Sequence, residues 1–484
     1  MIKLNKNQYL DKLHACWLGK NIGGTMGAPY EGTRHFNDIK GFITDSGEPM
    51  PNDDLDLQLV WLCAMEEIGA DRITANTLAE YWLDWIPPHW NEYGICKTNL
   101  RLGLLPPMSG EVDNEKWKTS NGAWIRSEIW ASLAPAAPDV AAKYATMDAM
   151  VDHGISEGSC AEIFTASIES LAYIESNIRI LLEAALKKIP EDSMTAKTQR
   201  LVIDCYDKGM SYHEARDKVV EFNRELGWFQ APGNLGFVTI GLLWGEGDFK
   251  KSLIYAINCG DDTDCTGATV GAILGIIGGT EAIPHELREH VGDRIVTVSI
   301  SGMYSPRIPK TCSALTDRVF ALVPAVMRAN NVSFAFTDGD TVYTKEELEA
   351  VNRLTSRVLL DRAPYSYDVT HYRPLTVRVE IDKRPRISEG DERQVALTLI
   401  CNPDILESRK YQIRLYLPDT WSVGNYDRTI TLPYPQPPHG IFGIEKTSFT
   451  VKVGERIEAV NRAYAELTCP TLPYPIIVPI IFIG

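Results

Sequence analysis

Two acidic clusters in the sequence carry side chains that could bind metal ions. The first, residues 51–56 (PNDDLD), places three carboxylates within four positions, and the second, residues 259–267 (CGDDTDCTG), also contains three. Carboxylates this close repel one another, and oxygen-rich clusters are the ligands that hard cations such as Mg²⁺ prefer. Each cluster directly precedes an apolar helical pattern, so both would lie at helix starts. Together they predict a site that could hold two divalent ions.

Helix capping is the alternative explanation for both clusters. Asn52 or Asp53 could cap the helix that follows, and acidic residues suit the positive end of a helix. Capping explains the second cluster less well, because one cap does not need three acids. The helical pattern after it carries Gly267, Gly271 and Gly275, each four residues apart. Such a stripe would let another helix approach closely and would bury the acids, and a buried carboxylate needs a cation or a proton.

Two further segments are candidates for contact with a ligand. Residues 120–126 (SNGAWIR) contain an Asn-Gly pair, and a glycine there lets backbone amides approach a ligand. A plain turn before a helix is the alternative. His153 follows an alanine-rich helical pattern, and a lone histidine is more often a packed or capping residue than a catalytic one.

Composition and charge exclude several classes of protein. The chain has 484 residues, 44% hydrophobic and 23% charged, which is typical of soluble globular proteins with two to four domains. A net charge of −16 repels phosphate backbones and argues against nucleic-acid binding. Neither a secretory signal nor an apolar membrane span is apparent, and the nine histidines form no HExxH zinc motif. The ten cysteines are scattered without a CxxC pair, so reduced thiols in the cytoplasm are expected.

Helical periodicity dominates residues 1 to about 335. Apolar residues recur at i, i+3, i+4 and i+7 from Leu57 to Ile68, as on one face of a helix. Further helices are expected at residues 78–85, 138–151, 160–174, 178–188 and 315–328. One more helix is expected near residues 345–360, within a linker that covers residues 336–364.

From about residue 365 the period of the apolar residues changes to two. Residues 375–381 alternate between apolar and polar, and so do residues 395–399, 413–417 and 449–453. Residues 475–483 are apolar on both faces, as in a buried strand. Twelve of the 28 prolines lie in residues 365–484, as expected of short strands joined by turns. The sequence therefore predicts a multidomain protein: a helical domain (1–335), the helical linker, and a small immunoglobulin-like β-sandwich (365–484).

In their order along the chain, these segments resemble the ADP-ribosylglycohydrolase family, which includes dinitrogenase-reductase-activating glycohydrolases and ADP-ribosyl-acceptor hydrolases. The motifs of that family are a glycine-rich first helix ending in Glu, an Asp-Asp pair, Asn-Gly-Ala-x-x-Arg, a histidine, and Gly-x-Asp-Thr-Asp. They match residues 19–31, 53–54, 121–126, 153 and 260–264. The resemblance covers roughly residues 8–330. It implies an all-α bundle with a binuclear Mg²⁺ or Mn²⁺ centre.

The resemblance also implies roles for individual residues. The implied metal ligands are Asn52, Asp53, Asp54, Asp262, Asp264 and Cys265. Glu31 matches the glutamate implicated in catalysis, and Asp54 is the second catalytic candidate. Asn121, Gly122 and His153 match the parts that contact the ligand.

Three positions depart from the family pattern. Asn52 and Cys265 stand where the family usually has threonine, and Lys20 stands where relatives often have aspartate. The Asn52 carbonyl oxygen could still coordinate a metal, whereas a thiol is a poor ligand for Mg²⁺. Asp56 is an extra acid that could compensate.

The function implied is that of a divalent-metal-dependent glycoside hydrolase. Two ions, Mg²⁺ or alternatively Mn²⁺ or Ca²⁺, would clamp sugar hydroxyls and acidify a water, while carboxylates stabilise an oxocarbenium-like transition state. The expected substrate is a small-molecule glycoside or an ADP-ribosyl compound with an N- or O-glycosidic bond. No nucleic-acid or membrane partner is expected, and an oligomer is compatible with this function. The alternatives are a protein de-ADP-ribosylating hydrolase in the strict sense and a non-catalytic ligand-binding descendant, against which the four retained aspartates argue.

Overall fold

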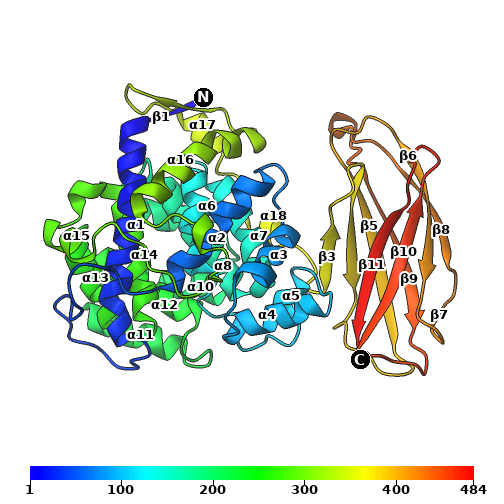
Figure 1. Ribbon diagram of the computed structural model, residues 1–484, viewed down its shortest axis with the longest axis horizontal. Coiled ribbons are helices and arrows are strands. Elements are labelled where there is room, and N and C mark those ends of the chain that lie inside the picture. Colours follow the sequence, from blue (N-terminus) through cyan, green and yellow to red (C-terminus); the bar gives the residue numbers. More distant parts are fainter. The chain divides into compact units, whose positions relative to one another are not determined.

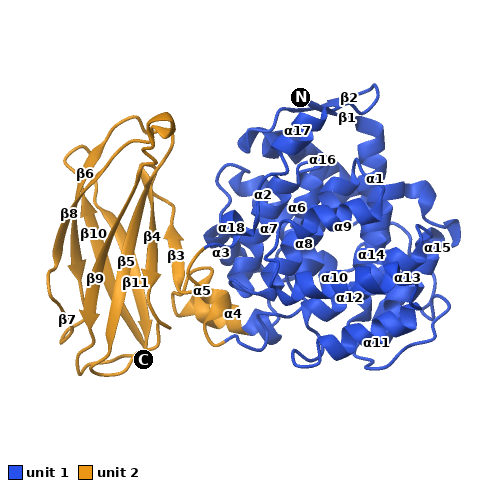
Figure 2. Cartoon of the chain, turned by 180° about the vertical axis from the view of Figure 1, so that it is seen from behind, with its two compact units in different colours: residues 1–94, 114–361 blue, residues 95–113, 362–484 orange.

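The chain folds into two units, and the second unit includes a segment that interrupts the sequence of the first. The computed structural model describes residues 1–484 and divides them into a first unit, residues 1–94 and 114–361, and a second unit, residues 95–113 and 362–484 (Figures 1 and 2). The first unit is mostly helical and the second is rich in β-strands, as predicted.

The helices of the first unit account for most of its residues. Their bounds are α1 (Lys6–Gly27), α2 (Asp53–Ile68), α3 (Ala75–Trp85), α6 (Glu128–Leu133), α7 (Pro138–Asp152), α8 (Glu157–Ala172), α9 (Ile178–Leu186), α10 (Met194–Asp207), α11 (Tyr212–Phe222), α12 (Ala231–Gly245), α13 (Phe249–Asn258), α14 (Thr263–Gly278), α15 (His285–Val291), α16 (Cys312–Ala329), α17 (Lys345–Ala350) and α18 (Ser356–Leu359). Helix α4 (Asn91–Arg101) begins in the first unit and ends in the second, to which α5 (Met108–Glu111) also belongs.

Helices α1 and α14 pack backbone against backbone through glycines. A Cβ atom built on Gly23 would lie 2.0 Å from the carbonyl oxygen of Gly267, and one on Gly271 would lie 2.1 Å from that of Gly19. Only glycine fits at such distances. The stripe predicted on α14 is therefore a helix-packing surface, and its partner is the first helix of the chain. This contact places the acids at the start of α14 inside the fold.

Two parts of the first unit differ from the helical prediction. Strands β1 (Ile2–Asn5) and β2 (Phe334–Thr337) form a parallel pair at the two ends of the helical region. The single helix expected at residues 345–360 is instead two short helices, α17 and α18. Between them, the backbone amides of Arg353 and Leu354 donate to the carboxylate of Asp139, at 2.7 and 3.1 Å. Because these amides bind a side chain, they cannot continue a helix.

The second unit is a sandwich of two antiparallel sheets. The strands are β3 (Ser366–Val369), β4 (Leu375–Ile381), β5 (Glu392–Cys401), β6 (Arg409–Tyr416), β7 (Ser422–Val423), β8 (Asp427–Leu432), β9 (Ile444–Lys452), β10 (Val460–Thr468) and β11 (Ile476–Ile483). One sheet has the order β3-β4-β5-β9-β7 and the other β11-β10-β6-β8. In β4 every second residue, from Leu375 to Ile381, is buried, which confirms the two-residue period.

Residues 95–113 lie far from the sandwich in sequence but contribute to its core. Leu104, Met108 and Val112 are fully buried in the same apolar cluster as the strand residues. Asp113 forms ion pairs with Arg384 and Arg386, at 3.2 and 2.7 Å. The sequence placed this segment in the helical domain, because its apolar residues do not reveal which core they enter.

The ten cysteines are free and buried, so none forms a disulfide. The cytoplasmic location expected from them stays a prediction. None of the helices is long and apolar enough to span a membrane.

Candidate metal and ligand site

A cavity of about 520 Å³ in the first unit collects most of the predicted site residues. Its acidic wall consists of Glu31, Asp53, Glu92, Asp262 and Asp264, and its aromatic wall consists of Trp90, Tyr93, Trp117 and Phe229. Asn52, Asn121, Gly122 and Cys265 also line it. None of the lining residues is a lysine, an arginine or a histidine.

The first acidic cluster sits at the start of α2, and its three aspartates point in different directions. Asn52 caps the helix, since its Oδ1 accepts from the amide of Asp54 at 2.7 Å. Asp53 lines the cavity and accepts a hydrogen bond from the Tyr93 hydroxyl at 3.2 Å. Asp54 is fully buried behind the cavity surface. Asp56 is also fully buried, but it accepts from the amides of Val298 and Ser299, at 2.7 and 2.5 Å, which gives it a structural role.

The second acidic cluster is a loop whose first aspartate holds the other two in place. Gly260 and Asp261 both have positive φ, +83° and +67°, and a Cβ on Gly260 would meet the backbone of His35 at 2.5 Å. The Asp261 carboxylate accepts from the amide of Phe229 at 3.0 Å and from the side chain of Asn234 at 2.8 Å. Asp261 therefore stabilises the loop through these hydrogen bonds, whereas Asp262 and Asp264 line the cavity.

The two clusters and Glu31 meet around Asp264. Ligand atoms of Glu31, Asp262 and Asp264 lie within 4.8 Å of one another, and so do those of Asp54, Asp264 and Cys265. Burial and the charge of Asp264 raise the pKa of Asp53 to about 6. Burial, Asp264 and Asp53 raise the pKa of Glu31 to about 7. The crowded carboxylates destabilise one another's charge, and a cation among them would relieve this.

The donor atoms fit a hard divalent cation. Asp54 Oδ2 and Asp264 Oδ1 are buried oxygens without a hydrogen-bond partner. Orphaned buried polar atoms are costly in a folded protein unless they bind something. Carboxylate oxygens are the donors that Mg²⁺, Mn²⁺ and Ca²⁺ accept.

Two of the departures from the family pattern, Cys265 and Lys20, lie beside Asp54. The thiol of Cys265 donates to Asp54 Oδ1 at 3.2 Å, and burial together with Asp262 raises its pKa well above the ordinary value. Cys265 is therefore a hydrogen-bond donor here. Lys20 is buried, pairs with Glu128 at 2.7 Å and lies 4.0 Å from Asp54 Oδ2. Its ammonium group brings a fixed positive charge close to the acids.

The Asn-Gly segment connects the acids to the rest of the cavity. The side chain of Asn121 donates to Asp262 Oδ2 at 2.6 Å and accepts from the indole of Trp124 at 3.1 Å. Gly122 has no room for a side chain, because a Cβ would lie 2.1 Å from Glu92 Oε1 and 3.3 Å from His153 Cε1. The glycine is thus required by packing between two buried side chains.

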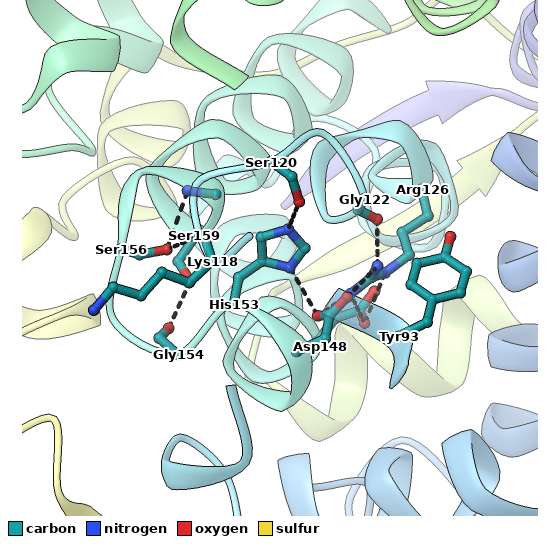
Figure 3. Close-up of polar contacts among 12 residues, drawn as sticks. Tyr93, Lys118, Ser120, Gly122, Arg126, Asp148, His153, Gly154, Ser156 and Ser159 are labelled. Atoms are coloured by element: carbon teal, nitrogen blue, oxygen red, sulfur yellow. Dashed lines mark hydrogen bonds and ion pairs between the residues drawn. The ribbon is translucent and has the colours of Figure 1, made fainter. Parts of the chain in front are cut away.

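His153 lies behind this segment and does not line the cavity. It is fully buried, with Nε2 3.2 Å from the Ser120 hydroxyl and Nδ1 3.0 Å from Asp152 Oδ1 (Figure 3). Arg126 donates to the carbonyl oxygen of Gly122 and pairs with Asp152 at 2.8 Å. Through these contacts, His153 and Arg126 both hold the segment that contains Ser120 and Gly122 in position.

Glu92 and the aromatic wall were not among the predicted site residues. Their signal in the sequence is the run Trp90-Asn91-Glu92-Tyr93 after two prolines, which mixes aromatic and polar residues at a helix start. Aromatic residues at such a position are usually explained by the core, so the run alone does not identify a ligand site.

With the fold and site described, the class of the protein follows from comparison with known proteins. A family model, ADP-ribosylglycohydrolase, matches residues 5–322. The chain belongs to the ADP-ribosylglycohydrolase family, which confirms the predicted resemblance and points to hydrolase activity.

Two solved structures are similar to parts of the chain. One, titled "ADP-ribosylglycohydrolase-related protein complex", is 19% identical over 66% of this chain and 99% of that chain, with a TM-score of 0.40. The other, a FixG-related protein from Vibrio parahaemolyticus, is 15% identical over 23% of this chain and 98% of that chain, with a TM-score of 0.18. A comparison with curated proteins gave no match.

Proposed function

We propose that this protein is a divalent-metal-dependent glycosidase that hydrolyses an N- or O-glycosidic bond. The observation that carries the proposal is the convergence of Glu31, Asp262 and Asp264 at one cavity, with Asp54 buried behind them and two buried carboxylate oxygens that lack hydrogen-bond partners. A non-catalytic descendant would have no reason to keep these acids crowded together.

The aspartates of the two clusters would hold the metal. Asp53, Asp54, Asp262 and Asp264 are the proposed ligands, and Asn52 and Cys265 are engaged in the capping and thiol hydrogen bonds. A divalent ion bound there, Mg²⁺ or alternatively Mn²⁺ or Ca²⁺, supplies Lewis-acid stabilisation of sugar oxygens.

Glu31 is the proposed base of the reaction. It is exposed at the cavity, and its carboxylate lies within 4.8 Å of those of Asp262 and Asp264, close enough to take a proton from a water held beside them. Asn121 is fixed by Asp262 and Trp124, so its segment offers a rigid edge against which the sugar can be oriented.

The cavity favours an uncharged glycoside over an ADP-ribosyl substrate. ADP-ribose carries a pyrophosphate, and none of the lining side chains is cationic, while five are acidic. Trp90, Trp117 and Phe229 offer apolar faces on which a sugar ring or an aromatic group can pack. A de-ADP-ribosylating hydrolase is the second candidate, supported by the family alone.

Metal removal and restoration test the proposal. We expect the chelated protein to be inactive toward a panel of neutral glycosides and to regain activity with Mg²⁺, Mn²⁺ or Ca²⁺. ADP-ribosyl-arginine and ADP-ribosyl-serine are tested in parallel for the second candidate. Asp264→Asn should lower Mn²⁺ affinity in calorimetry and reduce activity by at least about 10²-fold. Activity that survives chelation, or an unaltered Asp264→Asn enzyme, would refute the metal-dependent mechanism.

A further inference from the structure

Glu92 lines the cavity but belongs to neither of the metal-binding clusters. It stands near the start of α4, is 6% exposed, and its Oε2 is a buried oxygen without a hydrogen-bond partner. A buried oxygen in this state has lost its hydrogen bonds to water without a replacement, which is costly for the fold. Its position in the cavity wall suggests that a ligand uses it.

The Asn121-Gly122 segment connects Glu92 to the metal-binding acids. The side chain of Asn121 donates to Asp262, and a Cβ on the next residue, Gly122, would lie 2.1 Å from Glu92 Oε1. Glu92, Asp262 and Asp264 all line the cavity, so a ligand in the cavity can contact them together. Glycosidases use two carboxyl groups beside the scissile bond, one to donate a proton to the leaving group and one to accept a proton.

The surroundings of Glu92 bring its pKa closer to neutral pH. Burial raises its pKa to about 6; His153 opposes this shift, Asp152 adds to it, and the Ser120 hydroxyl opposes it. Arg126 faces the same group through its ion pair with Asp152. With this pKa, a minority of the molecules carry the proton at neutral pH, and a donated proton is readily recovered from solvent.

We propose that Glu92 is the general acid that protonates the leaving group, an assignment that rests on the proposed glycosidase function. The bond between the anomeric carbon and the leaving atom breaks, and the electron pair goes to the leaving atom, which takes the proton of Glu92. A water adds to the anomeric carbon, and its proton goes to Glu31. Solvent then returns a proton to Glu92 and removes one from Glu31, so the net reaction is hydrolysis.

Leaving groups of different basicity test this assignment in the metal-loaded enzyme. For a sugar that the wild type cleaves, we compare the methyl glycoside with the 4-nitrophenyl glycoside, whose leaving group departs without a proton. Glu92→Gln should lower kcat by about 10²–10⁴-fold on the methyl glycoside and by less than about tenfold on the 4-nitrophenyl glycoside. Because a general acid must be protonated, kcat of the wild type should fall as pH rises above the pKa of Glu92. Glu92→Gln should lack this fall in kcat.

Glu169→Gln is the matched control. Glu169 is likewise buried and has one carboxylate oxygen without a partner, but it does not line the cavity. We expect this variant to keep the wild-type dependence on the leaving group. Calorimetric titration with Mn²⁺ and the melting temperature are measured for both variants, and Glu92→Gln should match the wild type in each.

Several outcomes would overturn the assignment. An equal loss on both glycosides would make Glu92 a structural residue, and a loss of Mn²⁺ affinity would make it a metal ligand. The same leaving-group dependence in Glu169→Gln would show a general effect of altering buried acids. A wild type that cleaves no glycoside at all would overturn the proposed function and the assignment with it. An active wild type, with a Glu92→Gln variant that does not distinguish the methyl from the 4-nitrophenyl glycoside, would overturn the assignment alone.

Discussion

At the scale of single residues, the partner of each acid decides what the acid can do. Asp261 accepts hydrogen bonds on both carboxylate oxygens and holds its loop. Asp56 accepts two amide hydrogen bonds on Oδ2, although its Oδ1 has no partner. Asp54 and Asp264 also keep an oxygen without a partner, and their ligand atoms lie within 4.8 Å of one another. Proximity to other acids, and not a missing partner alone, therefore distinguishes the acids available to a cation.

Loss of Asp152 should destabilise the fold although this residue lies outside the cavity. It is fully buried and pairs with Arg126. Asp152→Asn would remove one of the negative charges that neutralise the buried guanidinium of Arg126. We therefore expect the free energy of unfolding at pH 7 to fall by roughly 3–5 kcal/mol. Denaturant unfolding measures this change. A loss below about 1 kcal/mol would contradict the importance of the pair.

The same residue predicts a dependence of stability on pH. Burial alone would raise the pKa of Asp152, but Arg126 and His153 more than offset it and bring the pKa to about 2, below the ordinary value of 3.8. An acid whose pKa is depressed by folding stabilises the fold above its unfolded pKa. Its contribution of roughly 2–3 kcal/mol should be lost as pH falls from about 4 to about 2.

Comparing acid unfolding of the wild type and Asp152→Asn tests this dependence. The difference in unfolding free energy between the two should shrink over that pH range. A constant difference from pH 6 to pH 2 would show that the ion pair does not set the pKa.

The sequence predicts which residues are acidic and where helices begin, and therefore the two clusters at α2 and α14. It does not predict which oxygens remain unpaired, because the partners come from distant positions, such as Asn234 for Asp261 and Val298 for Asp56. The same holds for Glu92, whose contact with Gly122 bridges separate segments.

At the scale of secondary-structure elements, the glycine contact between α1 and α14 positions the second acidic cluster. The Thr263 hydroxyl, at the start of α14, donates to the carbonyl oxygen of Gly27 at the end of α1 at 2.8 Å. Any separation of the two helices would therefore move the loop that carries Asp262 and the turn that carries Asp264.

Gly23→Ala should be strongly destabilising although alanine favours helices. Its Cβ would lie 2.0 Å from the backbone oxygen of Gly267, so the helices must separate. We expect a loss of more than about 3 kcal/mol in unfolding free energy and weaker Mn²⁺ binding, measured by denaturant unfolding and calorimetry.

Gly233→Ala is the control for this prediction. Gly233 lies in α12, and the nearest atom to its added Cβ is 3.9 Å away, so the substitution should stabilise the protein by up to about 1 kcal/mol. If Gly23→Ala were equally harmless, the close contact of α1 and α14 would be disproved.

Periodicity in the sequence identified most elements, because each helix or strand has one face in a core. The alternation in β4 and the glycine spacing in α14 are examples. The break between α17 and α18 could not be foreseen, since it depends on Asp139 binding amides more than 200 positions away. The parallel pairing of β1 with β2 joins the ends of a long segment, and nothing local indicates it.

At the scale of the whole molecule, the second unit is built from two separate stretches of chain. Residues 95–113 belong to the same unit as the sandwich, and the chain then returns to the helical unit (Figure 2). Their side chains Leu104, Met108 and Val112 join the apolar core of the sandwich. The change in periodicity near residue 365 indicates a β-domain but cannot reveal this excursion.

A chain cut after residue 361 should fold poorly for this reason. It would keep Leu104, Met108 and Val112 but lose the strands that bury them. We expect aggregation or a lowered melting temperature, measured by size-exclusion chromatography and calorimetry. Replacing these three residues with serine in the shortened chain should restore a monodisperse protein if their exposure is the cause, and persistent aggregation would point to another one.

The excursion of residues 95–113 also bears on how such a protein can arise and be re-engineered. A domain fused to the end of a gene can be gained or exchanged in one recombination event, but this sandwich depends on an internal stretch as well as the terminal one. A chimera that takes only the terminal stretch from a relative would join mismatched halves of one apolar core. The two stretches therefore form one structural unit, and shuffling libraries for this protein should exchange both stretches together.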